Sequence, residues 1–226
     1  AVLAANDALA VAAKTDANLK DASFTTNGAA VSMTATDGKV DLSTADDLKV
    51  LKASSLTVIA GVDADLGNRK VAATNDAMVT ASGSVNAAEA DLQASGALTL
   101  TAGNDVLATN AKLGGKSMAL TATTGSVMAT NAVLAANDAL AVAAKTDANL
   151  KDASFVTDAA SVSLTATDRK LDLSTADHAK ALNASSLTVI AGADTDLGNR
   201  KVTVTNEASI TAGGSVNATK TDLKAL

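Results

Sequence analysis

Apolar and polar residues alternate along most of the chain, in short stretches that end on alanine. The recurring pattern is apolar-x-apolar-x-Ala, and Ser, Thr or Ala mostly fills the positions between the apolar residues. Because successive side chains of a strand point to opposite faces, this period of two predicts β-strands with one buried face. The pattern occurs at Leu9-Val11-Ala13, Val31-Met33-Ala35, Leu56-Val58-Ala60, Ala77-Val79-Ala81, Leu98-Leu100-Ala102, Met118-Leu120-Ala122, Leu140-Val142-Ala144, Val162-Leu164-Ala166, Leu187-Val189-Ala191 and Ala208-Ile210-Ala212.

Successive copies of this pattern lie about 20 to 25 residues apart, and two further apolar features accompany many of them. Turn formers such as Asn27-Gly28 and Gly114-Gly115 separate the features, so each unit predicts two or three short strands joined by tight turns. The second feature is a short alternation at Val40-Leu42, Val85-Ala87, Val106-Ala108, Val127-Ala129, Leu171-Leu173 and Val216-Ala218. The third is a single apolar position at Phe24, Leu92, Leu113, Leu134, Phe155 and Leu223.

The chain also repeats on a longer scale. Segment 1–24 recurs without change at 132–155, and the match at an offset of 131 residues continues to Leu226 with about three-quarters of the paired positions identical. About six short units span this offset, so the chain holds about ten. We therefore expect one continuous domain over 1–226, made of a long repeat at 1–131 and a partial second copy at 132–226.

One coil per 20 to 25 residues, with short strands stacked in register, predicts an all-β fold, a parallel β-helix or β-solenoid of about ten coils. Ala, Val and Leu supply most of the 47% apolar content, whereas aromatic residues make up 1%. Such a composition suits a narrow interior that is filled one coil at a time. The chain has no Pro, which is consistent with backbone pairing along most of its length.

A helical repeat is the alternative, because alanine is the best helix former. Gly, Asn and Asp interrupt the chain about every ten residues, and Thr, Ser and Val fill the intervals. No apolar stripe at i, i+3, i+4 and i+7 persists in step with the repeat. These features favour strands.

Composition excludes several classes of function. The chain has no Cys and one His, so it offers no disulfide framework, thiolate metal site or His-rich cluster. A net charge of −6 and the scarcity of aromatic rings argue against nucleic acid as a partner. No run of eighteen apolar residues and no signal-peptide pattern occurs in this segment, so we expect no membrane insertion.

Two segments carry a resemblance to a known family. GALTLTAGNDVLATN at 96–110 and SSLTVIAGVDADLGN at 54–68 resemble the haemagglutinin repeats of filamentous haemagglutinin. That family comprises very large exoproteins of Gram-negative bacteria that are exported by two-partner secretion. It includes adhesins and the stalks of contact-dependent inhibition toxins. The resemblance implies a right-handed parallel β-helix, an extracellular or cell-surface location and a role as a long shaft.

These observations predict a structural shaft segment of a filamentous adhesin. The expected partners are neighbouring coils of the same chain, other copies through lateral or end-to-end association, and a host or bacterial surface receptor. Neither end carries a polar capping segment, so we expect the isolated chain to associate. The alternative is a repeat-built binding module for ice, calcium or glycan. A solenoid enzyme would show irregular coils and a non-repeating cluster of acids and bases, so we expect no enzyme, no catalytic residue and no cofactor.

The weak calcium candidates are Asp63, Asp65, Asp194 and Asp196. They stand in Asp-x-Asp-x-Gly-Asn segments, where alternate carboxylates and a glycine turn are able to wrap a hard cation. Threonine replaces the twelfth-position Glu of an EF-hand, which favours interpretation as a longer turn with solvated acids.

Threonine pairs offer a candidate ice-binding face. Aligned on the strand pattern, Thr101 matches Thr121 and Thr34, whereas Thr99 matches Ala119 and Ser32, so the rows are ragged and ordinary outward threonines are expected. The pairs are Thr34/Thr36, Thr99/Thr101, Thr121/Thr123, Thr165/Thr167 and Thr203/Thr205.

The remaining candidates are interpreted as surface features. His178 corresponds to Asp47 in the first copy, which indicates a surface turn. Arg69-Lys70 and Arg200-Lys201 are predicted to be small basic spots, too isolated to bind nucleic acid. Asn183 and Asn217 open N-glycosylation sequons that occur only in the second copy.

Overall fold

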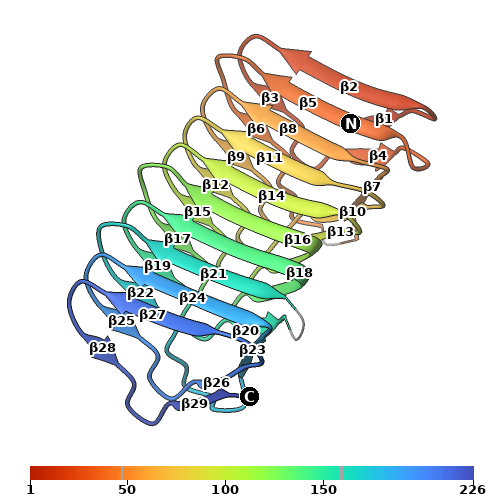
Figure 1. Ribbon diagram of the computed structural model, residues 1–226. Coiled ribbons are helices and arrows are strands. Elements are labelled where there is room, and N and C mark those ends of the chain that lie inside the picture. The colour runs from red at the N-terminus through yellow and green to blue at the C-terminus, as the bar shows by residue number, and fades with distance from the viewer. Residues whose placement is uncertain (47, 158–159) are drawn as a thin grey trace.

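The computed structural model describes residues 1–46, 48–157 and 160–226. These residues form β-strands and no helix, wound into a parallel β-solenoid of about eleven turns (Figure 1). The predicted all-β parallel β-helix of about ten coils is confirmed. Asp47, the first-copy counterpart of His178, lies outside the described residues.

The first face of the solenoid is a long parallel sheet that runs through every turn from β2 to β27. All ten copies of the apolar-x-apolar-x-Ala pattern lie in these strands. They are β2 (Ala8–Ala13), β5 (Ala30–Ala35), β8 (Leu56–Ala60), β11 (Ala77–Ala81), β14 (Ala97–Ala102), β16 (Lys112–Ala122), β18 (Val133–Ala144), β21 (Ser161–Ala166), β24 (Ser186–Ala191) and β27 (Ala208–Ala212).

The second face is a parallel sheet of ten two-residue strands, which correspond to the predicted second alternation. They are β3 (Ala17–Asn18), β6 (Val40–Asp41), β9 (Ala64–Asp65), β12 (Val85–Asn86), β15 (Val106–Leu107), β17 (Val127–Met128), β19 (Ala148–Asn149), β22 (Leu171–Asp172), β25 (Thr195–Asp196) and β28 (Val216–Asn217).

The third face is not continuous. β1 pairs only with β4, a middle group joins the long strands β16 and β18, and β23, β26 and β29 form a separate sheet. Over the described residues, the ladder is therefore broken between β4 and β7 and between β20 and β23. The strands are β1 (Val2–Ala4), β4 (Ser23–Thr25), β7 (Val50–Ala53), β10 (Lys70–Ala73), β13 (Asp91–Ala94), β20 (Ser154–Val156), β23 (Leu182–Ala184), β26 (Lys201–Val204) and β29 (Asp222–Ala225).

The core follows directly from the alternation. In β14, Leu98, Leu100 and Ala102 are fully buried, whereas Thr99 and Thr101 point outward and remain partly exposed. Each residue lies beside its counterpart in the next turn, so inward columns of Ala, Val and Leu run along the axis. Small and medium aliphatic side chains fill this narrow interior, which accounts for a large apolar content almost without aromatic rings.

Corners of the coil require a residue with positive φ. Non-glycine residues adopt this conformation about once per turn, and Asn is the most frequent of them, as in Asn68 and Asn110 with φ of 55° and 58°. Asparagine tolerates the left-handed region better than most residues. The asparagines between the apolar features therefore mark the corners.

Candidate functional site

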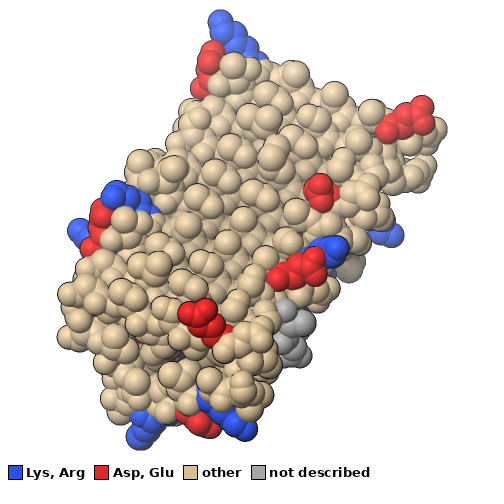
Figure 2. Space-filling model, in the orientation of Figure 1, with Lys and Arg blue, Asp and Glu red and all other residues tan. Residues whose placement is uncertain are grey.

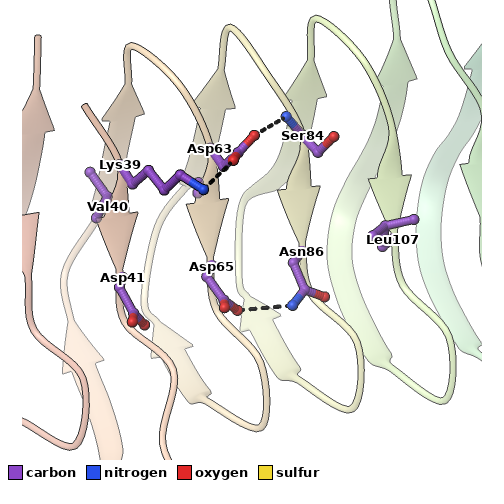
Figure 3. Close-up of a pocket in the computed structure, with 9 residues that line it drawn as sticks. Lys39, Val40, Asp41, Asp63, Asp65, Ser84, Asn86 and Leu107 are labelled. Carbon is purple, nitrogen blue, oxygen red and sulfur yellow. Dashed lines mark hydrogen bonds and ion pairs between the residues drawn. The ribbon is translucent and has the colours of Figure 1, made fainter. Parts of the chain in front are cut away.

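The calcium candidates Asp63 and Asp65 flank the second face at β9 and line a shallow hollow of about 450 Å³. Figure 3 shows the two carboxylates engaging different partners. Asp63 Oδ2 lies 2.9 Å from the Lys39 ammonium nitrogen, and Asp63 Oδ1 accepts a hydrogen bond of 2.9 Å from the Ser84 amide. Asp65 Oδ1 accepts a hydrogen bond of 3.0 Å from the Asn86 side chain. Both carboxylates thus bond to the following coil.

These contacts set the charge state of the pair. The hydrogen bond from the Ser84 amide, and then the bond from Lys39, lower the pKa of Asp63 below its ordinary value. The hydrogen bond to Asp63 and the attraction of that carboxylate raise the pKa of Lys39. Asp63 is therefore an anion, already neutralised by a cation of its own chain.

The second copy repeats this arrangement with one change. Asp194 accepts a hydrogen bond of 2.8 Å from the Ser215 amide. Lys170, the counterpart of Lys39, contacts other aspartates than Asp194. Its ammonium nitrogen lies 3.1 Å from Asp172 and 3.4 Å from Asp196. Burial alone would raise the pKa of Asp172, but the hydrogen bonds from Ser174 and Lys170 together with the attraction of Lys170 outweigh it, so the pKa lies below its ordinary value. A lysine thus neutralises part of the acidic cluster in each copy.

Asp63 and Asp194 make a contact that recurs at the corners of the coil. A corner aspartate accepts a hydrogen bond from the backbone amide of a residue in the next coil, which links neighbouring turns in addition to the backbone ladder. The donor and acceptor pairs are Lys39 and Asp16, Ser84 and Asp63, Ser126 and Asp105, Lys170 and Asp147, and Ser215 and Asp194. No group of three or more His, Cys, Asp or Glu among the described residues is placed to hold a metal ion. The geometry thus gives these aspartates a structural role, and calcium binding stays a prediction.

Glycine completes the corner. Gly83 and Gly125 directly precede Ser84 and Ser126, whose backbone amides donate hydrogen bonds to Asp63 and Asp105. A Cβ at either glycine would collide with the aspartate oxygen. Glycine therefore leaves room for the close approach of the aspartate at these corners. The second copy has Arg169 at an equivalent corner, so that corner also accommodates a side chain, and the guanidinium lies 3.9 Å from Asp147.

The structural role of Arg69 and Arg200 is the main feature that the sequence pattern did not predict. The prediction of basic surface spots is wrong for both arginines, because neither exposes any of its surface. Each directly precedes the second strand after a break in the third face, β10 for Arg69 and β26 for Arg200. At the break itself the ladder does not provide hydrogen-bond donors for the backbone carbonyl groups that face the interior.

The guanidinium of Arg69 supplies those donors. Its Nε donates to the Leu42 carbonyl at 2.6 Å, and its Nη1 donates to the carbonyls of Ala22 at 3.1 Å and Lys49 at 3.4 Å. Its Cζ lies 5.4 Å from the centre of the Phe24 ring, which is within the range of a cation–π contact.

Arg200 makes the same contacts in the second copy. Its Nε donates to the Leu173 carbonyl, and its Nη1 donates to the carbonyls of Ala153 and Lys180 at 3.0 Å each. The ring of Phe155 lies 5.2 Å from its Cζ. Burial lowers the pKa of Arg200 to about 10 and lowers that of Arg69 in the same direction. Nη2 of both arginines has no hydrogen-bond partner within the described chain.

The break exists because one coil in each copy is longer. From Phe24 to Leu51 the chain advances 27 residues, whereas from Leu92 to Leu113 it advances 21. The extra residues form an outward loop before β7. Asp21 anchors this loop by accepting hydrogen bonds of 3.0 Å from both the Thr44 hydroxyl and the Ala45 amide, which lower its pKa.

The anchors recur in the second copy. Asp152 accepts bonds of 3.1 Å from the Thr175 hydroxyl and 2.7 Å from the Ala176 amide, and Lys180 donates at 2.7 Å to the Asp152 carbonyl. His178 lies on the loop at 174–181 and is exposed, with Nδ1 2.9 Å from the Asn199 carbonyl oxygen. Its interpretation as part of a surface turn is confirmed.

The sequons lie on different faces of the coil. Asn183 lies within β23, beside the second break of the third face. Its backbone carbonyl accepts a hydrogen bond of 2.6 Å from the Thr157 hydroxyl. Asn217 ends β28 and is exposed, with its side-chain amide donating to Asp196 at 3.0 Å.

The threonine pairs do not form a double row. Thr99 and Thr101 both lie on the outward side of β14, whereas Thr203 lies in β26 on another face. The register places Thr101 beside Thr121 and Thr99 beside Ala119, which confirms that the rows are ragged.

No helix in the part of the chain that the structure describes is long and apolar enough to cross a membrane. Comparisons with protein-family models, curated proteins and solved structures find no match for this chain.

Proposed function

We propose that the chain is a shaft segment of a large secreted filamentous adhesin on the surface of a Gram-negative bacterium, which extends a distal binding or toxin domain. The observation that carries this proposal is the passage of the ladder from one long repeat into the next. β16 of the first copy and β18 of the second pair at ten positions, through Ala122 and Ala144. A unit that stacks on its own copy in this way is extended by duplication, as a shaft requires.

The mechanical role rests on two layers of bonds between coils. Parallel backbone ladders join each turn to the next on the first and second faces, and corner aspartates such as Asp63 add charge-assisted bonds to backbone amides. At the two interruptions of the third face, Arg69 and Arg200 replace the missing donors. The resemblance to filamentous haemagglutinin repeats supports placing such a rod outside the cell.

Electron microscopy of chains with one, two and three copies of the 131-residue repeat tests the shaft. Each added repeat should lengthen a rod of constant width by about 29 Å, since six coils rise about 4.8 Å each. Compact particles that grow in every dimension would contradict the proposal.

The surface location needs a separate experiment in the source bacterium. Antibody against the chain should label intact cells, and protease added outside should remove the signal while a periplasmic marker survives. Labelling that requires cell lysis would contradict the adhesin, whatever the length measurements give.

A further inference from the structure

The outward side of the first face carries few charges. In the strand segments that hold the apolar-x-apolar-x-Ala pattern, the outward residues are Ala, Ser and Thr, with three larger side chains, Ile59, Met78 and Ile190. The charged residues Asp76, Lys116, Asp138 and Glu207 lie where these segments begin. Charged residues make up 19% of the sequence, yet Figure 2 shows few of them on this broad surface, in a row along one side of it. A water-facing sheet usually carries mixed charges, so a sheet face of this size with so few charges indicates an interaction surface.

We propose that this face pairs with the same face of a second copy, with the two solenoid axes antiparallel. The two-fold axis lies along β14, so that each strand faces a different strand of the partner except at the centre. β11 then faces β16, β8 faces β18, and β2 faces β24. Identical patches meet in such an isologous contact, and the assembly closes as a dimer.

The positions of the three large side chains select this arrangement. The register gives three outward columns, and a two-fold axis along the strands keeps each column opposite itself. Met78 of one copy then faces Ala119 of the other, Ile59 faces Ala143, and Ile190 faces Ala12. Every protruding side chain therefore meets an alanine, as close packing of two sheet faces requires.

The three side chains are available for such contacts. Ile59, Met78 and Ile190 expose 42%, 38% and 44% of their surface. At the margin, Asp76 directly precedes β11, and Lys116 directly precedes Ser117 of β16 and lies 3.3 Å from Asp138 of its own chain. The pairing brings Asp76 of one copy toward this ion pair of the other, twice by symmetry.

The area is sufficient for a stable dimer. Nine paired strands at about 4.8 Å, each five or six residues long, cover about 40 Å by 18 Å, or about 700 Å² per copy. The total of about 1,400 Å² lies within the range of specific protein interfaces. This inference goes beyond the proposed shaft, because a shaft needs no lateral partner, and its failure would leave the length test untouched.

A charge at the centre of the face tests the dimer by analytical ultracentrifugation. Thr99→Lys places two ammonium groups opposite each other on the two-fold axis and should weaken association at least about a hundredfold. Ala72→Lys, an exposed position on the third face, is the matched control and should dimerise like the parent. Circular dichroism and melting temperature confirm that both variants fold. Association that survives Thr99→Lys, as end-to-end stacking would, overturns the proposal.

Disulfide trapping tests the register, since the chain has no cysteine of its own. A mixture of Met78→Cys and Ala119→Cys chains should form cross-linked dimers, and neither variant alone should do so. Cross-linking of Met78→Cys alone would indicate parallel axes and overturn the arrangement. A parent chain that stays monomeric at every concentration also overturns it, and thermal hysteresis by that monomer would assign the face to ice instead.

Discussion

Replacing Arg200 by Met should destabilise the second break of the third face by about 3 kcal/mol. The guanidinium donates to three buried carbonyl oxygens, and each one left without a donor costs about 1–3 kcal/mol, or about 6 kcal/mol together. Burial, partly offset by the attraction of Asp152 and Asp172, lowers the pKa of Arg200 from 12.5 to about 10, which corresponds to a net penalty of about 3 kcal/mol on the charged form that removing the charge returns. The lost hydrogen bonds therefore outweigh the recovered desolvation.

Two measurements resolve this loss. The melting temperature should fall by about 6–12 °C, the shift expected for a chain of this size. Hydrogen exchange should accelerate in the loop at 174–181 and in β23, because each coil of a solenoid depends on its immediate neighbours. Met fills most of the vacated volume, so the effect reports on the carbonyl groups more than on a cavity.

Two further variants control the experiment. Lys201→Met removes the adjacent, exposed cation and should leave both measurements unchanged. Arg200→Lys keeps the charge but lacks the planar fork that reaches three carbonyls, so it should destabilise at least as much as Arg200→Met. If Arg200→Met melts with the parent and protects 174–181 equally well, the account of the buried arginine is wrong.

Four shorter predictions concern the corners and the core. The fold lowers the pKa of Asp63 below 3.8, so its carboxylate stabilises the fold above that pH, and this stabilisation is lost as pH falls through the folded-state pKa. Asp63→Asn should therefore have a lower urea midpoint than the parent at pH 7, and its midpoint should fall less than that of the parent between pH 7 and pH 2. Gly125→Ala should cost about 1–3 kcal/mol in urea unfolding, because the new Cβ meets the Asp105 carboxylate. Leu120→Ala should cost about 2–5 kcal/mol by creating a core cavity, whereas Thr121→Ala on the same strand should change stability by less than about 0.5 kcal/mol. Millimolar calcium should leave the parent's melting temperature unchanged, since carboxylates such as Asp63 and Asp65 already have hydrogen-bond partners in the chain. A clear rise in melting temperature with calcium would instead support a calcium site.

The sequence was sufficient to predict the coil, its number of turns and the inward columns. These depend on side-chain alternation, which a period of two specifies locally, and on a repeat that forces equivalent residues into register. Leu98, Leu100 and Ala102 illustrate the point, because the pattern alone assigns them to the core and the structure buries all three. The partners of Asp63 and Asp65 lie outside such reasoning, since they depend on side-chain rotamers at a corner.

The buried arginines were missed for a different reason. Arginine is rarely buried, so the sequence pattern favours interpreting Arg69 beside Lys70 as a basic spot. A signal was present in the spacing, because the interval from Phe24 to Leu51 is longer than its neighbours and Arg69 follows in the next coil. Recognising it requires the idea that an outward loop leaves carbonyl groups without donors, which no local pattern contains.

This dependence excludes duplication of the longer coil by itself. A coil of ordinary length stacks on any similar coil, so duplication in steps of one coil would preserve the ladder. The longer coil is different, because it buries carbonyl groups that only an arginine in the following coil satisfies, beside the ring of Phe24 or Phe155. Copying either coil alone would leave unpaired carbonyl groups or an unpaired buried charge, at a cost of several kcal/mol. Only a segment that carries the loop, the aromatic ring and the arginine together can be duplicated without that cost, and the 131-residue unit carries all three.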